Sequence, residues 1–156
     1  MELYTVLTAD VIASRRQEAV VATKKAKLRE ITDTNLITPF TFSRGDEIQA
    51  VLYGALSSPA LLRKLRYHCL PLQLRIGIGI GRITSGLGAT SSWEMNGPAF
   101  HRARQALDEM KKNRHWRTRL VSGDPGLDHM INTMFNLYDA IQSRWTLPQW
   151  EGVMLY

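Results

Sequence analysis

The sequence predicts a single mixed α/β (α+β) domain in which helices cover an antiparallel sheet. Three observations lead to this prediction. Segments that alternate apolar and polar residues occur between segments whose apolar residues have helical spacing. The length of 156 residues is close to the commonest size of one domain. The hydrophobic fraction of 44% and the charged fraction of 22% are ordinary for a globular protein with its own core.

The elements follow one another along the chain. Strands are expected at residues 2–9, 37–42, 48–53, 72–83 and 117–121, and helices at residues 14–32, 59–69, 98–112, 124–144 and 146–156. The first strand is rich in β-forming residues. The first helical stretch mixes small and apolar residues with basic ones until Asp33-Thr34-Asn35 interrupts it. The turn around Gly45 joins the second and third strands as a β-hairpin.

The fourth strand has the clearest pattern. Aliphatic residues line one of its faces, and Gly77, Gly79 and Gly81 share the other face with Arg75. The glycines leave that face bare, so a helix or a ligand is expected to lie close against it. Because this GxGxG pattern lies within a strand and opens no helix, it does not indicate a phosphate-binding or dinucleotide-binding loop.

Helices dominate the C-terminal part. Pro98 is expected in the first turn of one helix, and Asp124-Pro125 supplies the N-cap and first residue of the next. An apolar stripe of this second helix is expected to face the core: Leu127, Met130, Ile131, Met134, Leu137, Tyr138 and Ile141. The last helix is expected to bury Leu147, Trp150, Val153 and Met154.

The first six elements follow the order β-α-β-β-α-β, the ferredoxin-like arrangement of an antiparallel sheet with helices on one face. We predict that this fold occupies residues 1–122 and that residues 123–156 form a C-terminal helical extension. A right-handed crossover makes the first two strands parallel, so the third strand runs antiparallel beside the first. The end of the first strand, at Asp10, is therefore expected beside Asp46 and Glu47.

Neighbouring carboxylates repel one another unless a cation lies between them. We predict that Asp10, Asp46 and the adjacent Glu47 hold Mg²⁺ or Mn²⁺, with the backbone carbonyl of Val11 as a further ligand. The alternative is structural: Asp10 caps the first helix or pairs with an arginine, and Asp46 is only a turn residue.

A phosphate site is expected next to these carboxylates. The first helix should begin near Ser14 and present free N–H groups and the positive end of its dipole. Arg15 and Arg16 add positive charge, and Arg75 and Arg104 are further candidates for contacting phosphate. Together these residues indicate a site for a metal-bound nucleoside triphosphate.

The charge, the cysteine content and the lack of a long apolar run limit which ligands and which cellular locations are expected. The net charge of +6 is concentrated in residues 101–119 and suits a nucleotide or a nucleic-acid backbone, although a solvated helix face explains it more simply. Cys69 is the only cysteine, so an intramolecular disulfide is excluded, and a buried structural thiol is expected. No apolar run is long enough to span a membrane, and a cytoplasmic location is expected.

Four segments in a fixed order resemble a known family. They are YTVLTADVIAS, FTFSRGDEIQAVL, LQLRIGIGIGRITSGLG and MNGPAFHRARQAL. Together they resemble the SatD family of bacterial proteins, which is similar to class III nucleotide cyclases, diguanylate cyclases and the CRISPR polymerase palm. The resemblance covers roughly residues 3–121. It implies a palm-type fold, catalytic metal-binding roles for Asp10 and Asp46, and homodimerisation.

The chain also departs from the cyclase pattern. It has His101 where cyclases carry an asparagine, and Arg104 lies one position from the expected arginine. The hairpin turn reads RGDEI, so the GGDEF signature of diguanylate cyclases is absent. These departures affect the expectation of cyclisation more than that of metal and triphosphate binding.

Three functions are therefore compared. The first is a palm-like domain that binds a nucleoside triphosphate with a divalent metal, either as a nucleotidyl cyclase or transferase or as a degenerate relative. The second is a non-catalytic nucleotide-sensing or oligomerising domain of a bacterial transcriptional or stress regulator. Here the resemblance implies that RWTLPQWEGVMLY begins a truncated helix-turn-helix, so DNA would be bound only through the missing module. Direct nucleic-acid binding ranks last, because residues 74–83 lack aromatic residues for base stacking.

Overall fold

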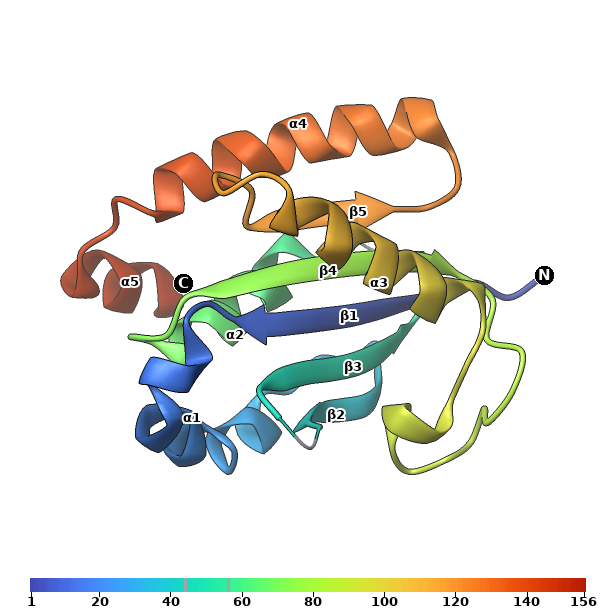
Figure 1. Cartoon of the computed structure of the whole chain (residues 1–156), viewed down its shortest axis with the longest axis horizontal. Coiled ribbons are helices and arrows are strands. Elements are labelled where there is room, and N and C mark those ends of the chain that lie inside the picture. The colour runs from blue at the N-terminus through green and yellow to red at the C-terminus, as the bar shows by residue number, and fades with distance from the viewer. Residues whose placement is uncertain (44, 56) are drawn as a thin grey trace.

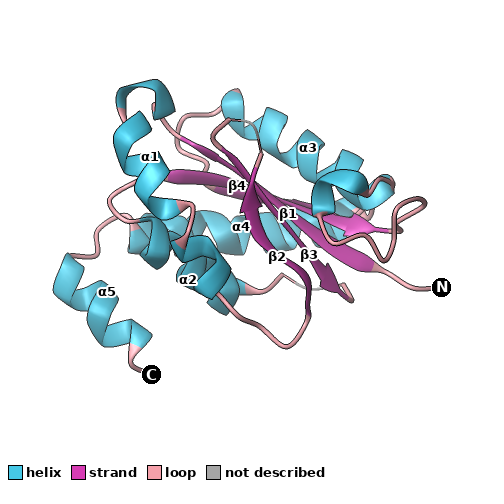
Figure 2. Cartoon of the chain, turned by 90° about the horizontal axis from the view of Figure 1, so that it is seen from below, coloured by secondary structure: helices cyan, strands magenta, loops and turns pink. Residues whose placement is uncertain are grey.

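The computed structural model describes residues 1–43, 45–55 and 57–156 and shows one sheet with helices on both of its faces (Figures 1 and 2). The strands are β1 (Tyr4–Val11), β2 (Leu36–Phe42), β3 (Glu47–Tyr53), β4 (Leu74–Gly81) and β5 (Thr118–Val121). The helices are α1 (Glu18–Lys24), α2 (Pro59–Cys69), α3 (Pro98–Lys111), α4 (Pro125–Gln142) and α5 (Leu147–Met154). Short 3-10 helices are η1 (Ser14–Arg16), η2 (Lys27–Glu30) and η3 (Ser92–Glu94). The prediction of a mixed α/β fold is confirmed.

The sheet has the strand order β2-β3-β1-β4-β5. The first four strands of this order are antiparallel to their neighbours, and β5 runs parallel to β4. β1 and β3 are neighbours, as the crossover argument predicts, and their ladder ends with Asp10 opposite Glu47. Among the described residues no helix is long and apolar enough to cross a membrane.

One face of the sheet carries the main core. Aliphatic residues of β1, β3 and β4 pack there against α1, η2 and α2, and the leucines of α2 are fully buried. The single helix expected over residues 14–32 is instead divided into η1, α1 and η2. The first interruption is at Gln17, whose φ of −133° lies outside the helical region.

The opposite face of β4 explains its glycines. α3 lies directly against Gly77, Gly79 and Gly81, so the bare face accommodates a helix. A Cβ atom at Gly79 would lie 2.0 Å from the carbonyl oxygen of Ala99 and 2.3 Å from the amide nitrogen of Ala103. Both are backbone atoms, which no rotamer change can move away.

Replacing Gly79 by alanine is therefore expected to destabilise the fold by about 1–3 kcal/mol, because α3 must move away from β4. Gly152→Ala is the matched control, since a Cβ atom there meets nothing within 4 Å. Chemical denaturation of both variants measures the difference. Equal stabilities would show that the contact between α3 and β4 is loose.

The orientation of α4 differs from the sequence prediction. Asp124 caps this helix as predicted, through hydrogen bonds from the amides of Gly126 and Leu127. The predicted core stripe is, however, largely exposed at Leu127, Met130, Met134, Leu137 and Ile141, whereas Ile131 and Tyr138 are half-buried. The residues buried on the inner side are Asn132, Phe135, Asp139 and Gln142. In α5, Trp150 is buried as expected but Leu147 is exposed.

The edge strand β5 explains why a mainly polar face points inward. An edge strand presents backbone N–H and C=O groups that need partners. The amide side chain of Asn132 accepts a hydrogen bond from Leu120 N at 2.7 Å and donates one to Leu120 O at 2.9 Å. One turn earlier, the carboxylate of Asp128 accepts hydrogen bonds from the amide and hydroxyl of Ser122. α4 therefore covers the edge of the sheet by hydrogen bonding.

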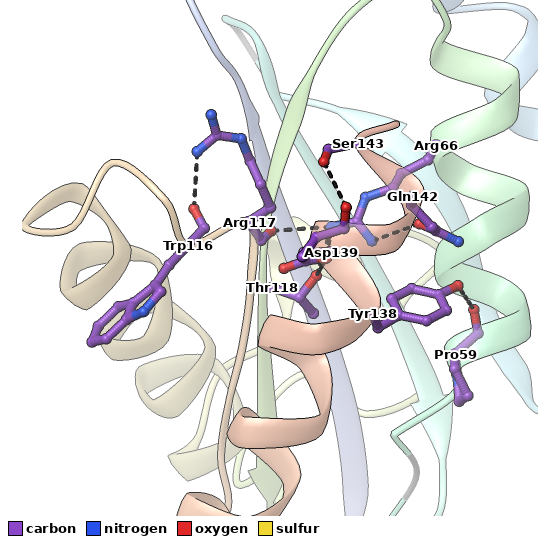
Figure 3. A network of polar contacts seen from close by, with 10 residues as sticks. Pro59, Arg66, Trp116, Arg117, Thr118, Tyr138, Asp139, Gln142 and Ser143 are labelled. Atoms are coloured by element: carbon purple, nitrogen blue, oxygen red, sulfur yellow. Dashed lines mark hydrogen bonds and ion pairs between the residues drawn. The ribbon is translucent and has the colours of Figure 1, made fainter. Parts of the chain in front are cut away.

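A buried ion pair continues this contact (Figure 3). Arg66 of α2 and Asp139 of α4 lie 3.1 Å apart, with side chains only 11% and 6% exposed. Thr118 joins them, because its hydroxyl accepts a hydrogen bond from Arg66 at 2.6 Å and donates one to Asp139 at 2.8 Å. Burial raises the pKa of the Asp139 carboxyl and lowers the pKa of the Arg66 guanidinium.

Candidate functional site

Three charged residues form a row across the ends of three strands. Asp10 of β1 lies opposite Glu47 of β3 on one side and opposite Arg75 of β4 on the other. Side chains alternate along a strand, so residues opposite one another share a face of the sheet. Arg75 Nε donates a hydrogen bond to Asp10 Oδ1 at 3.1 Å. The row is on the face that α3 covers.

α3 adds two cations above this row. Arg104 forms an ion pair with Glu47, and Lys111 Nζ lies 3.9 Å from Asp10 Oδ2. Lys111 also lies 3.8 Å from Asp108 of the same helix. Three cationic side chains thus face three carboxylates. The carboxylates of Asp10 and Glu47 are already compensated by basic partners, as the structural alternative for Asp10 anticipates.

Asp46 lies on a different side of the strand ends. It precedes β3 and lines a cavity of about 360 Å³ together with Ser14, Arg15, Glu18 and Lys25. Glu47 is the first residue of β3 and pairs with Asp10, whereas Asp46 belongs to the bend before this strand. The direct neighbour of Asp10 is therefore Glu47. The structure brings Asp46 together with Ser14 and Arg15, while Arg16 is exposed.

The loop after β1 has an unusual backbone. Ala13 has the left-handed conformation, with φ 56° and ψ 37°, and η1 follows directly. The amide groups of Arg16 and Gln17 donate hydrogen bonds to Ala13 O and Ser14 O, and the amide groups of Ala13, Ser14 and Arg15 precede them in the same tight turn. A left-handed residue followed by right-handed ones forms a concave nest of N–H groups that suits an anion. This nest takes the place of the helix N-terminus that the sequence predicts.

These groups have the chemistry for a metal-bound anion. Oxygen donors of the kind that Mg²⁺ and Mn²⁺ prefer come from Asp10, Asp46 and Glu47. Among the described residues, no three His, Cys, Asp or Glu side chains are gathered closely enough to hold a metal by themselves. A cation at this site therefore requires further ligands, for which the oxygens of a phosphate are suitable.

The single thiol of the chain was also considered as a reactive group. Cys69 is fully buried at the end of α2, and burial raises the pKa of its thiol to about 12. A thiol with this pKa is almost entirely protonated near neutrality. The expectation of a structural cysteine is confirmed.

Comparison with known families covers almost the whole chain. The model of the SatD family matches residues 4–154. The chain belongs to the SatD family. The match extends beyond the sheet and includes α4 and α5, so the C-terminal helices of this SatD protein are part of the family pattern. Comparison with curated proteins gives no match.

The sequence prediction missed Lys111 as a member of the site. The signal was present, because Arg104, Asp108 and Lys111 are spaced by four and three residues and so share one face of a helix. What was lacking was the direction of that face, which depends on the packing of α3 against the glycines of β4.

Proposed function

We propose that this SatD-family protein binds a nucleoside triphosphate together with a divalent metal at the ends of β1, β3 and β4. In this proposal Asp10, Glu47 and the carbonyl of Val11 hold Mg²⁺ or Mn²⁺, and Asp46 joins them by turning from the cavity that it lines with Arg15. Arg15, Arg16, Arg75, Arg104, Lys111 and the nest at Ala13–Arg15 contact phosphate. The strand order β2-β3-β1-β4 supports the finer assignment of a ferredoxin-like palm fold, because it brings the ends of the first and third strands together.

The observation that carries the proposal is the balanced charge row. A divalent metal alone would have to displace Arg75 and Lys111 from Asp10 and would then lie beside those released cations. A triphosphate alone would have to separate the same cations from the carboxylates. A metal and a triphosphate together satisfy both sets, since the metal takes the carboxylates and the phosphates take the cations.

This reasoning predicts an order of affinities. We expect Mn²⁺-ATP or Mn²⁺-GTP to bind at least about 10-fold more tightly than the nucleotide in the presence of a chelator, and Mn²⁺ alone to bind weakest. Isothermal titration calorimetry of the wild-type chain with the three ligands measures this order. Binding of Mn²⁺ alone that equals binding of the complex would contradict the coupling, and no binding of any nucleotide would refute the proposal.

When bound, the metal would neutralise charge on the triphosphate and lower the pKa of an attacking hydroxyl. Mass spectrometry after incubation with ATP, GTP and Mn²⁺ tests whether the proposed function includes such chemistry. A cyclic or linked nucleotide with pyrophosphate identifies a nucleotidyl cyclase or transferase. Binding without either product identifies a degenerate relative.

One observation favours a second candidate, a nucleotide-sensing domain of a regulator. The carboxylates of Asp10 and Glu47 have basic partners before any ligand arrives, so ligand binding must rearrange Arg75, Arg104 and Lys111. Arg104 and Lys111 lie on α3, so an exchange of their ion-pair partners would change the contacts that hold this helix against the sheet. Protection of α3 amides in hydrogen exchange, compared with and without Mn²⁺-nucleotide, tests this candidate. Unchanged protection on saturation would contradict it.

A further inference from the structure

The exposed side of α4 carries a regular apolar seam. Its members are Leu127, Met130, Met134, Leu137 and Ile141, which are between 40% and 65% exposed. Their spacings alternate between three and four residues over the length of the helix. This is the spacing of the core positions of a two-helix coiled coil, in which side chains of one helix fit between those of another. The seam has no partner among the described residues, and α4 runs along one long edge of the molecule (Figure 1).

We infer that the seam is the contact surface between two copies of this chain. The first argument is charge. The chain has a net charge of +6, yet no lysine or arginine occurs between Arg119 and Arg144. On α4 itself, Asp128 is bonded to Ser122 and Asp139 is buried, so His129 is the one exposed ionisable residue of this helix. Two basic molecules can approach here without repulsion, whereas a charged partner would find no counter-charge on this face.

The second argument is area. Five Leu, Met and Ile side chains at this exposure present on the order of 500 Å² of apolar surface, at the upper end of what monomeric proteins expose. Two copies would together bury roughly 1,000 Å², which reaches the lower limit of a specific interface. Small residues flank the seam at Gly126, Thr133 and Ala140, so the two helices can approach closely.

The two helices are expected to be antiparallel. A two-fold axis beside Met134 sets Leu127 opposite the partner's Ile141 and Met130 opposite the partner's Leu137, so every apolar position has a partner. Antiparallel packing also pairs the opposite ends of the two helix dipoles.

Sedimentation equilibrium of the wild-type chain at micromolar concentration tests this inference. A dimer is expected, and Leu137→Glu should raise its dissociation constant roughly 30-fold or more, because a charge would be buried in the seam. Asn136→Glu adds the same charge one position away, outside the seam, and should leave the dimer intact. Circular dichroism spectra at 25 °C should be unchanged in both, since residues 136 and 137 are exposed, so a loss of the dimer cannot be ascribed to unfolding. A monomeric wild-type chain, or equal weakening by both variants, would overturn the inference.

Cysteine cross-linking tests whether the two α4 helices are antiparallel, and it can refute the inference independently of sedimentation. Met134→Cys should form a disulfide-linked dimer on mild oxidation, because this residue lies at the axis. In Leu127→Cys the two thiols would be roughly 20 Å apart and should not cross-link. Cys69 is fully buried and does not compete. Cross-linking of Leu127→Cys but not of Met134→Cys would overturn the antiparallel arrangement.

The seam on α4 is separate from the charge row. Leu137→Glu should therefore retain nucleotide binding, so the dimer and the proposed function can fail independently.

Discussion

Asp10→Asn is expected to weaken the binding of Mn²⁺-ATP by roughly 100-fold while leaving metal-free ATP binding unchanged or stronger. The reason is that Asp10 has two kinds of partner. In the absence of ligand it pairs with Arg75 and Lys111, and in the proposed complex it holds the metal. Removing its charge abolishes a metal ligand but frees two cations for phosphate. Calorimetry with ATP, in the presence of Mn²⁺ or of a chelator, measures both effects.

The matched control is Glu2→Gln. It removes one negative charge beyond the opposite end of β1, where Glu2 accepts a hydrogen bond from the hydroxyl of Tyr4 that a glutamine can still accept. Its affinities should equal those of the wild type. Should Asp10→Asn bind Mn²⁺-ATP as the wild type does, Asp10 is not a metal ligand and only the structural alternative, an ion pair with Arg75, remains.

Arg66→Met is expected to reduce the free energy of unfolding by about 3–5 kcal/mol near neutral pH. It removes the partner of a carboxylate whose side chain is only 6% exposed, and it leaves Asp139 as an uncompensated buried charge. Arg63→Met on the same helix is the control, because Arg63 forms no ion pair among the described residues. The double variant Arg66→Met/Asp139→Leu should recover most of the loss, since it removes both charges together.

The raised pKa of Asp139 determines how the effect of Arg66→Met on stability changes with pH. Burial raises the pKa of Asp139 above the ordinary value of 3.8, so the folded state binds its proton more tightly than the unfolded state does. The stability that this group contributes is therefore present below about pH 3.8 and is lost as the pH rises through the folded-state pKa. Arg66 lowers that pKa, so its removal raises it further.

The loss of stability in Arg66→Met should consequently be smaller at about pH 4 than near pH 7. Urea denaturation at the two pH values measures the difference. The same loss at both would mean that Asp139 is not charged in the folded wild type.

Much of the arrangement of the candidate site can be predicted from the sequence. The period-two pattern of β4 predicts which face carries Arg75 and the glycines, because alternation along a strand follows from backbone geometry alone. The handedness of the crossover predicts that β1 and β3 are neighbours, which places Asp10 within one ladder spacing of the residues that begin β3. These inferences need only local pattern and chain topology.

The tertiary structure alone decides how amphipathic helices are oriented. The stripe from Leu127 to Ile141 has helical spacing, and spacing does not say whether a stripe meets the core or another molecule. In α4 the decision depends on β5 and the residue after it, because their unpaired groups find hydrogen-bond partners on the face that carries Asp128, Asn132 and Asp139. Leu120 N, Ser122 N and the Thr118 hydroxyl donate to these side chains, and Leu120 O accepts from Asn132. Similarly, Lys111 joins the charge row because the glycines of β4 allow α3 to lie directly on the sheet. Local periodicity thus determines the elements and their faces, and the hydrogen-bonding and steric demands of distant strands determine where those faces point.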